Sequence, residues 1–410
     1  MRCDVVVVGL GPAGAHFSYL ASKHGYKVVA LEKEVVHKSK TCAGGISAIS
    51  VKILRECYRR IPSEVVERKI DKLNLVTQTY RCSLDLPKVD AFTTRRLKFD
   101  GWLVDEAVEK GTIVKEQCKL KGISFSKESV VVEIHENGSL EEIQANVVIG
   151  AYGMRSSVSK MVGMSVPKSI TGVQYELELP ELEIERVFGN ALTFIVDTRF
   201  SRFGYVWIFP KGDSIAVGLN DRETTQIGER LRSFIRTHER TSRLFKGVVE
   251  ADLKMSAALL PNETLIETHK ERMMLIGDAA GFGDRITGEG ISYALQSAGC
   301  AFRAFNYAYG RGDFSADTLR VYRRLWESAF GLDLRYGKKL QKIIFDEDPD
   351  GTWSQLIQLL CENEKFQEHM MGELIENFSM ARAIVKLPIR EKLLLLKTFG
   401  YKNAWTFIRP

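Results

Sequence analysis

Residues 4–14 have the sequence DVVVVGLGPAG, in which four valines lead directly into a GxGxxG pattern. The valine run predicts a short buried strand, residues 13–24 predict a helix, and residues 27–31 (KVVAL) predict a second buried strand that ends before Glu32. A strand, a glycine-rich turn, a helix, a second strand and an acid are typical, in this order, of a dinucleotide-binding βαβ unit. The stretch therefore predicts an α/β fold with a Rossmann domain that binds a nucleotide cofactor.

Each glycine of this turn has its own physical role. Gly9 permits the tight turn, Gly11 lets the backbone approach a pyrophosphate, and Gly14 lets the helix pack closely on the strand. The helix N-terminus offers free N–H groups and the positive end of a dipole to the phosphates. The predicted nucleotide contacts come from the turn and from the end of the second strand: Gly9, Gly11, Pro12, Ala13, Gly14, Glu32 and Lys33.

Composition places the chain among globular proteins of two or three domains. It has 410 residues, of which 45% are hydrophobic and 27% charged, and its net charge is +6. The basic residues are scattered, so the charge does not indicate nucleic-acid binding. A mild positive charge is compatible with an anionic substrate or an anionic membrane face.

The cysteines do not form a recognisable framework. They are Cys3, Cys42, Cys57, Cys82, Cys118, Cys300 and Cys361, without CxxC pairs or metal-ligand spacing with histidines. The odd count in a long chain favours a reducing compartment over a disulfide scaffold, and it leaves a single disulfide open. There is no signal peptide and no apolar run that approaches a membrane span, so we expect a cytoplasmic protein.

The strand-to-helix pattern recurs at residues 145–153 and 273–290, which predicts that the nucleotide domain is discontinuous. Between its parts the chain is rich in β-type alternation, and after Ala316 it is almost entirely helical and amphipathic. We expect a nucleotide domain from residues 1–70, 91–165 and 266–330, a β-rich substrate domain from residues 71–90 and 166–265, and a C-terminal helical region from residues 331–410.

The third of these strand ends carries a second set of candidate cofactor contacts. Asp278 follows Gly277 at the end of a strand, where its carboxylate is able to hold a ribityl or ribose hydroxyl; a helix N-cap is the alternative. The amides of Gly288, Gly290 and Ile291 open a long helix and are able to stabilise negative charge on a reduced isoalloxazine.

Several motifs together resemble a known family. GLGPAG with Glu32, RLKFDGWL at residues 96–103 and GDAAGF at residues 277–282 resemble the flavoprotein superfamily of the aromatic hydroxylases. YVWIFP at residues 205–210 resembles the YxWxFP signature of the geranylgeranyl reductase family, as do TCAGG at residues 41–45 and TGEGI at residues 287–291. The resemblance covers about residues 1–330.

This resemblance implies a glutathione-reductase-like FAD-binding Rossmann domain with an inserted antiparallel-sheet substrate domain. It implies FAD as the cofactor and the saturation of trisubstituted double bonds in geranylgeranyl chains of membrane-lipid precursors. The substrate is then a prenylated lipid or a prenyl diphosphate, and the electron donor is NADPH or a reduced ferredoxin-like carrier. A flavin monooxygenase and a non-catalytic prenyl-lipid-binding flavoprotein are the rival interpretations.

The resemblance also implies residue roles. Cys42 lies near the flavin as a proton donor or pocket residue, with a small buried hydrophobe as the alternative. Tyr205 is the second candidate donor, and Tyr205, Trp207 and Phe209 share one face of a strand that lines the prenyl site or packs a sheet core. Further contacts to flavin or substrate are expected from Ala43, Gly44, Gly45, Arg96 and Leu120; a surface salt bridge is the alternative for Arg96.

Two residues depart from the family pattern, and one of them, Arg285, leaves the head group of the substrate open. Tyr152 stands where much of the superfamily has an acid, which weakens the hydroxylase interpretation. Arg285 replaces a proline that is common in archaeal lipid reductases and looks more like the chlorophyll-pathway branch. The apolar and basic stripes of the C-terminal helices either pack on the protein's own body or rest on a membrane as a peripheral contact.

Overall fold

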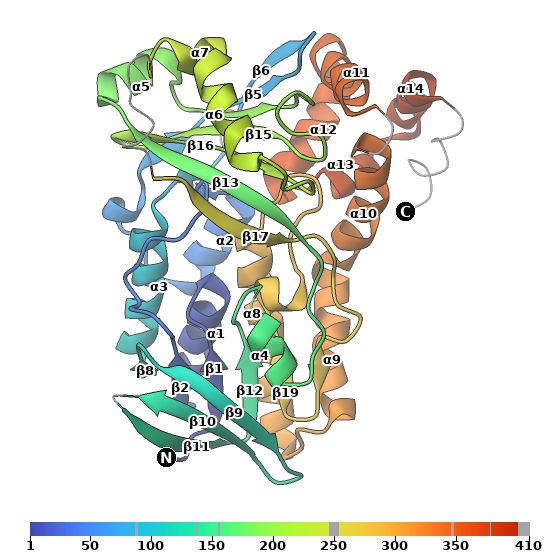
Figure 1. Cartoon of the computed structure of the whole chain (residues 1–410). Coiled ribbons are helices and arrows are strands. Elements are labelled where there is room, and N and C mark those ends of the chain that lie inside the picture. Colours follow the sequence, from blue (N-terminus) through green and yellow to red (C-terminus); the bar gives the residue numbers. More distant parts are fainter. Residues whose placement is uncertain are drawn as a thin grey trace.

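The computed structural model describes residues 1–86, 89–136, 138–154, 156–245, 254–345, 348–377 and 379–400. A six-stranded sheet occupies the lower half of the molecule in Figure 1. Its strands follow the order β18 (His269–Lys270), β19 (Met273–Leu275), β12 (Val147–Gly150), β1 (Val5–Val8), β2 (Val28–Leu31) and β8 (Ile113–Lys115). All neighbouring strands are parallel except β18 and β19.

Helices and a small sheet enclose this six-stranded sheet. α1 (Pro12–Lys23) contacts α3 (Arg96–Glu109) and α8 (Ile291–Arg311), and α8 contacts α9 (Ala316–Trp326). The antiparallel strands β9 (Lys119–Phe125), β10 (Val130–Glu136) and β11 (Ser139–Ala145) add their apolar residues to the same core. The predicted βαβ unit is confirmed, because all four residues of β1 and of β2 are buried.

A second, seven-stranded sheet lies above the first (Figure 1). Its order is β17 (Ser256–Pro261), β13 (Ser169–Glu178), β16 (Ser214–Asp221), β15 (Val206–Pro210), β14 (Ala191–Ile195), β5 (Lys72–Val76) and β6 (Arg81–Asp85). All its strands fall within the two segments predicted for the substrate domain. The domain boundaries themselves stay a prediction, and residues 401–410 lie outside the described part.

Shorter elements connect and cover the two sheets. A three-stranded sheet pairs the central strand β7 (Ala91–Thr93) with β3 (Gly45–Ile46) and β4 (Arg68–Ile70). The remaining helices of the first three hundred residues are α2 (Ala48–Cys57), α4 (Ser156–Met161), α5 (Glu181–Val187), α6 (Ile227–Thr237) and α7 (Glu239–Ser242). Helix α5 interrupts a segment that was expected to be β-rich, because Pro180 precedes it and Glu181 and Glu183 suit the N-terminal turn of a helix.

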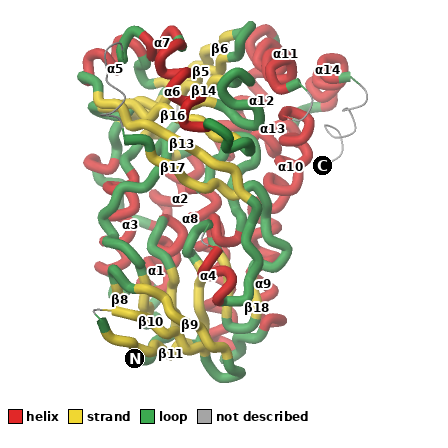
Figure 2. Tube along the Cα trace, in the orientation of Figure 1, coloured by secondary structure: helices red, strands yellow, loops and turns green. Residues whose placement is uncertain are grey.

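The C-terminal helices pack on the seven-stranded sheet. They are α10 (Leu332–Phe345), α11 (Pro349–Glu362), α12 (Glu364–Asn377), α13 (Met380–Lys386) and α14 (Ile389–Phe399), and they share one apolar cluster with that sheet. Figure 2 shows these helices in red beside the yellow strands of the sheet. A disulfide between Cys82 on β6 and Cys361 on α11 links the two parts. None of the helices in the described ranges is long and apolar enough to cross a membrane.

Candidate active site

One cavity of about 800 Å³ lies where the two large sheets meet. Every residue that the sequence singles out for cofactor or substrate lines it, except Gly14. These residues are Gly9, Gly11, Pro12, Ala13, Glu32, Lys33, Cys42, Ala43, Gly44, Gly45, Arg96, Leu120, Tyr205, Trp207, Phe209, Gly277, Asp278, Gly288, Gly290 and Ile291. The structure thus brings the predicted residues together, while their individual roles stay predictions.

The glycine-rich turn fits a diphosphate. A Cβ on Gly9 would lie 2.5 Å from the carbonyl oxygen of Ala151, and one on Gly14 would lie 1.9 Å from that of Gly9. A Cβ on Gly11 meets no described atom within 4 Å, so this residue faces open space. Among the described residues no side chain caps α1, and its first turn holds no acid. The free amides there suit an anionic group such as the diphosphate of FAD.

Glu32 is held at the end of β2 by three donors. Its carboxylate accepts hydrogen bonds from the amides of Leu10 (3.2 Å) and Glu34 (3.1 Å), and it pairs with Lys38 Nζ at 2.7 Å. A carboxylate has about four lone-pair sites, so one remains for a ribose hydroxyl. Leu120 and Lys33 line the same cavity.

Asp278 lines the cavity and is not the N-cap of a helix. It lies in the short 3₁₀ helix η3 (Gly277–Ala280), whose N-cap is Ile276, and no described residue donates a hydrogen bond to its carboxylate. Burial raises the pKa of Asp278 above its ordinary value. A partly buried carboxylate without a partner among the described residues suits a ligand hydroxyl, and the ribityl role itself stays a prediction.

The turn before α8 is rigid and acidic. Asp284 Oδ1 accepts from the amides of Ile286 (2.9 Å) and Thr287 (2.7 Å). Glu289 accepts from the amide (2.7 Å) and hydroxyl (2.6 Å) of Ser292. Burial is the main reason that the pKa of Glu289 rises to about 7. The turn thereby presents Gly288, which has a φ of +66°, and the N-terminus of α8 to the cavity.

Arg96 forms a buried ion pair instead of a surface salt bridge. Its guanidinium makes two hydrogen bonds of 2.6 Å to Asp100 and the residue is 8% exposed. Burial opposes its charge, but the Asp100 carboxylate and the Cys42 side chain raise the pKa of Arg96 overall. The guanidinium therefore places a fixed positive charge in the cavity wall beside Cys42.

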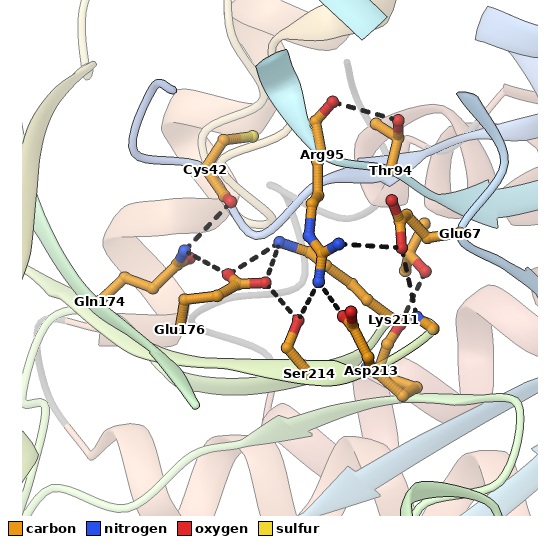
Figure 3. A network of polar contacts seen from close by, with 12 residues as sticks. Cys42, Glu67, Thr94, Arg95, Gln174, Glu176, Lys211, Asp213 and Ser214 are labelled. Atoms are coloured by element: carbon orange, nitrogen blue, oxygen red, sulfur yellow. Dashed lines mark hydrogen bonds and ion pairs between the residues drawn. The ribbon is translucent and has the colours of Figure 1, made fainter. Parts of the chain in front are cut away.

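The Cys42 main chain is tied to the seven-stranded sheet. Its carbonyl accepts a hydrogen bond of 3.2 Å from the side-chain amide nitrogen, Nε2, of Gln174 on β13 (Figure 3). The carboxylate of Glu176, two residues farther along β13, pairs with Lys211 (Figure 3). Cys42 is half-buried at the cavity wall and belongs to the free cysteines.

The aromatic face of β15 lines the cavity and also belongs to the apolar cluster of the seven-stranded sheet. The ring of Phe194 on β14 lies 5.2 Å from that of Tyr205 and 5.3 Å from that of Phe209. The Tyr205 hydroxyl donates to the carbonyl of Thr287, and burial raises the pKa of this phenol. Phe209 contacts Gly45, where an added Cβ would lie 3.1 Å from its ring.

A second, apolar chamber of about 110 Å³ was not expected from the sequence. It lies between the seven-stranded sheet and the helices α11, α12 and α13, and its lining includes Trp353, Ile357 and Met371. It shares five lining residues with the large cavity, namely Ala91, Leu192, Phe194, Tyr205 and Thr287. The alternating apolar residues of β5 and the apolar stripes of the C-terminal helices are the sequence features that form this chamber. The sequence does not show that these distant segments meet.

The two departures from the family pattern have structural roles. Tyr152 lines the cavity, and its hydroxyl accepts from Ser159 at 3.3 Å. Arg285 is 4% exposed and donates to the carbonyls of Pro261 (2.9 Å) and Gly281 (2.8 Å). Because its guanidinium holds the turn, Arg285 gives no basis for choosing a head group.

Comparisons with known proteins agree with this geometry. The model of the family described as FAD binding domain matches residues 2–324. Digeranylgeranylglycerophospholipid reductase 2 of Methanopyrus kandleri is 31% identical over 384 residues, covering 91% of this chain and 94% of its own. Digeranylgeranylglycerophospholipid reductase of Methanocaldococcus jannaschii is 27% identical and covers 97% of both chains.

Solved structures show the same fold. A geranylgeranyl bacteriochlorophyll reductase-like protein from Thermoplasma acidophilum superposes with a TM-score of 0.79 at 21% identity, covering 97% of this chain and 99% of its own. The flavin-dependent brominase Bmp2 superposes with a TM-score of 0.73 at 17% identity, covering 92% and 94%. At these identities the likeness concerns the fold alone.

Proposed function

Because this chain belongs to the FAD binding domain family and to the digeranylgeranylglycerophospholipid reductases that share it, we propose that it saturates the geranylgeranyl chains of a glycerophospholipid. It is an FAD-dependent oxidoreductase. Reduced FAD supplies the hydride for an unpolarised double bond. The chain's own residues then have to hold the alkene, exclude water and deliver a proton.

The observation that carries the proposal is the apolar chamber beside the flavin cavity. A prenyl chain is long and has no polar group to hold, so it needs a continuous apolar wall. Tyr205 and Phe194 line both spaces, so a prenyl chain that extends from one space into the other passes the aromatic face of β15. A hydroxylase of a compact aromatic substrate has no need for the second chamber.

The proton comes from the chain itself in this proposal. The Cys42 thiol gives its proton to one alkene carbon, and the Arg96 guanidinium beside it stabilises the thiolate that remains. The phenol of Tyr205 is the second candidate donor. Its hydrogen bond to the Thr287 carbonyl and its high pKa favour a role in shaping the site over one in acid catalysis.

Electron supply and lipid access are finer parts of the same proposal. The electron donor in this proposal is either NADPH or a reduced ferredoxin-like carrier. Both are kept because the sequence has no second GxGxxG pattern that would indicate a separate nicotinamide site. Peripheral contact with a membrane is supported by the exposed face of α14, where Ile389 is 78% and Leu393 is 50% exposed.

Anaerobic turnover tests the function. FAD-loaded protein is reduced chemically, mixed with a digeranylgeranylglycerophospholipid, and the product is analysed by mass spectrometry. We expect a mass gain of one hydrogen pair for each double bond reduced. Insertion of oxygen in air would indicate a monooxygenase, and binding of unchanged lipid would indicate a carrier; either result overturns the proposal.

A further inference from the structure

Three residues on neighbouring strands form a row across the seven-stranded sheet. Gln174 on β13 pairs with Gly218 on β16, which pairs with Trp207 on β15. A Cβ on Gly218 would lie 2.3 Å from Cζ2 and 2.5 Å from Cε2 of the indole. The absence of a side chain at residue 218 therefore lets the indole lie across β16 and reach Gln174.

The amide of Gln174 connects this indole to Cys42. Trp207 Nε1 donates to Gln174 Oε1 at 3.2 Å, and Gln174 Nε2 donates to the Cys42 carbonyl at 3.2 Å. An indole N–H only donates and a carbonyl only accepts, so the amide has one satisfied orientation. Gln174 is 4% exposed, which makes both bonds costly to lose.

A charged pair contacts the same amide nitrogen of Gln174 that donates to Cys42 (Figure 3). Glu176 accepts from Gln174 Nε2 at 3.5 Å and pairs with Lys211 Nζ at 2.7 Å. A Cβ on Gly44 would lie 3.4 Å from Cε of Lys211, so the segment that carries Cys42 lies against this ion pair. The arrangement leaves the Cys42 carbonyl little freedom relative to β13.

We propose that Gln174 is a positioning residue that couples the Trp207 indole to the main chain of Cys42. A prenyl chain that contacts the indole then also changes the placement of the Cys42 thiol. The proposal rests on the proposed function for the identity of the lipid; the coupling between the two residues does not depend on it. Gln174 is not part of the patterns by which the sequence resembles its family.

Alkylation of Cys42 tests the coupling. FAD-loaded protein is treated with iodoacetamide, with and without digeranylgeranylglycerophospholipid, and modification of Cys42 is followed by peptide mass spectrometry. Gln174→Met removes the side-chain hydrogen bonds to Trp207, Cys42 and Glu176. Gln174→Glu keeps the acceptor for the indole but turns an oxygen toward the Cys42 carbonyl. Trp207→Phe removes the indole donor, together with the part of the ring that lies over Gly218, and keeps the Gln174 amide.

Without lipid, we expect each Gln174 variant to alkylate about fivefold faster than the wild type, the equivalent of losing the one hydrogen bond that holds the Cys42 carbonyl. Adding Trp207→Phe to Gln174→Met should produce no further increase, because the coupling is already absent. Lipid should slow alkylation in the wild type, and this protection should fall to less than half in Gln174→Met. Ser256→Ala, which removes a 3.3 Å bond to the main-chain oxygen of Gln174, is the matched control and should behave as the wild type.

Equal alkylation rates in wild type and variants, or additive effects of the two substitutions, would overturn the coupling. If Gln174→Met does not fold, Gln174→Glu decides alone. A protein that shows the coupling but leaves the lipid unreduced refutes the proposed function only. A protein that reduces the lipid without the coupling refutes only the role of Gln174, so the two failures are distinguishable.

Discussion

The phenol of Tyr205, on β15, donates a hydrogen bond to the main-chain carbonyl of Thr287, in the turn before α8. This bond joins the seven-stranded sheet to the segment that presents the helix N-terminus to the cavity. Tyr205 also lines both the large cavity and the apolar chamber. One side chain therefore connects the cofactor site to the space proposed for the prenyl chain.

Tyr205→Phe should keep FAD but lower kcat by about tenfold, because loss of the bond shifts the turn relative to the aromatic face. Stability should fall by about 1 kcal/mol for the lost hydrogen bond. Tyr322→Phe is the matched control, since Tyr322 donates a buried bond of 2.6 Å to the carbonyl of Leu275 on β19. Steady-state kinetics and urea unfolding separate the effects; equal activity losses in both variants would assign the effect of Tyr205 to stability alone.

Cys42→Ala and Cys42→Ser should bind FAD normally and lose about 100-fold in kcat, the typical range for removal of a general acid. Cys300→Ala, at a buried cysteine of α8 outside the cavity lining, should leave kcat unchanged. Anaerobic lipid turnover and the absorbance of bound flavin are the measurements. Full turnover by Cys42→Ala with bound FAD removes the thiol from the mechanism.

Local sequence was sufficient for the nucleotide end of the site. The strand, turn and helix of residues 5–23 depend on neighbouring residues, so their pattern predicts them within one residue. The buried pair of Arg96 and Asp100 also has a local spacing, four residues along a helix, but it was not predicted: a surface salt bridge was the alternative given for Arg96. Local pattern therefore predicts the cavity residues of the nucleotide end, while those of the flavin end were predicted from the resemblance to a family.

Local sequence patterns do not predict the contacts between strands and helices that are far apart in the sequence. The path from Trp207 over Gly218 to Gln174 depends on the register of three strands, which no local pattern sets. The chamber depends on how α11, α12 and α13 meet β5 and β14, and Cys82 pairs with Cys361 across 279 residues. A buried amide among the apolar neighbours Val173 and Tyr175 was the one available signal for Gln174.

Gly14→Ala and Gly11→Ala should act on different properties. A Cβ on Gly14 would lie 1.9 Å from the carbonyl oxygen of Gly9, so this variant should unfold at a lower temperature and lose FAD. A Cβ on Gly11 has open space, so this variant should keep its melting temperature without cofactor but bind FAD at least tenfold more weakly.

Gly299→Ala is the control and should be neutral or stabilising, because a Cβ at this position of α8 also meets no described atom within 4 Å. Thermal melts of apoprotein and flavin titrations check these outcomes; a Gly11→Ala protein with unchanged FAD affinity would contradict the phosphate role.

The stability of the protein should decrease between about pH 4.5 and pH 7 through Glu289. Its pKa rises from 4.5 to about 7 on folding, chiefly by burial. In this window the folded state keeps a proton that the unfolded state has released, so the free energy of unfolding falls as pH rises. Asp278 and Asp284, whose pKa values burial also raises, act in the same direction.

Glu289→Gln should flatten this slope while it keeps an acceptor for Ser292. Glu271→Gln, at an exposed turn, should leave the slope as in the wild type. Urea unfolding at pH values from 4.5 to 7.5 is the measurement. An unchanged slope in Glu289→Gln would show that another group carries the pH dependence.

Met371→Trp should separate the chamber from the cofactor site. Met371 lies on α12, is 8% exposed and lines only the apolar chamber. The larger indole fills space that the proposal assigns to the far end of the prenyl chain, so KM for a geranylgeranyl lipid should rise about tenfold. A lipid with shorter geranyl chains should be reduced as by the wild type, because it does not reach this residue.

Overpacking costs about 1–3 kcal/mol by itself, so Met164→Trp, at a buried methionine outside the two cavities, is the matched control. Kinetics with both lipids decide the matter: equal losses on long and short chains would mean that the chamber does not hold the substrate.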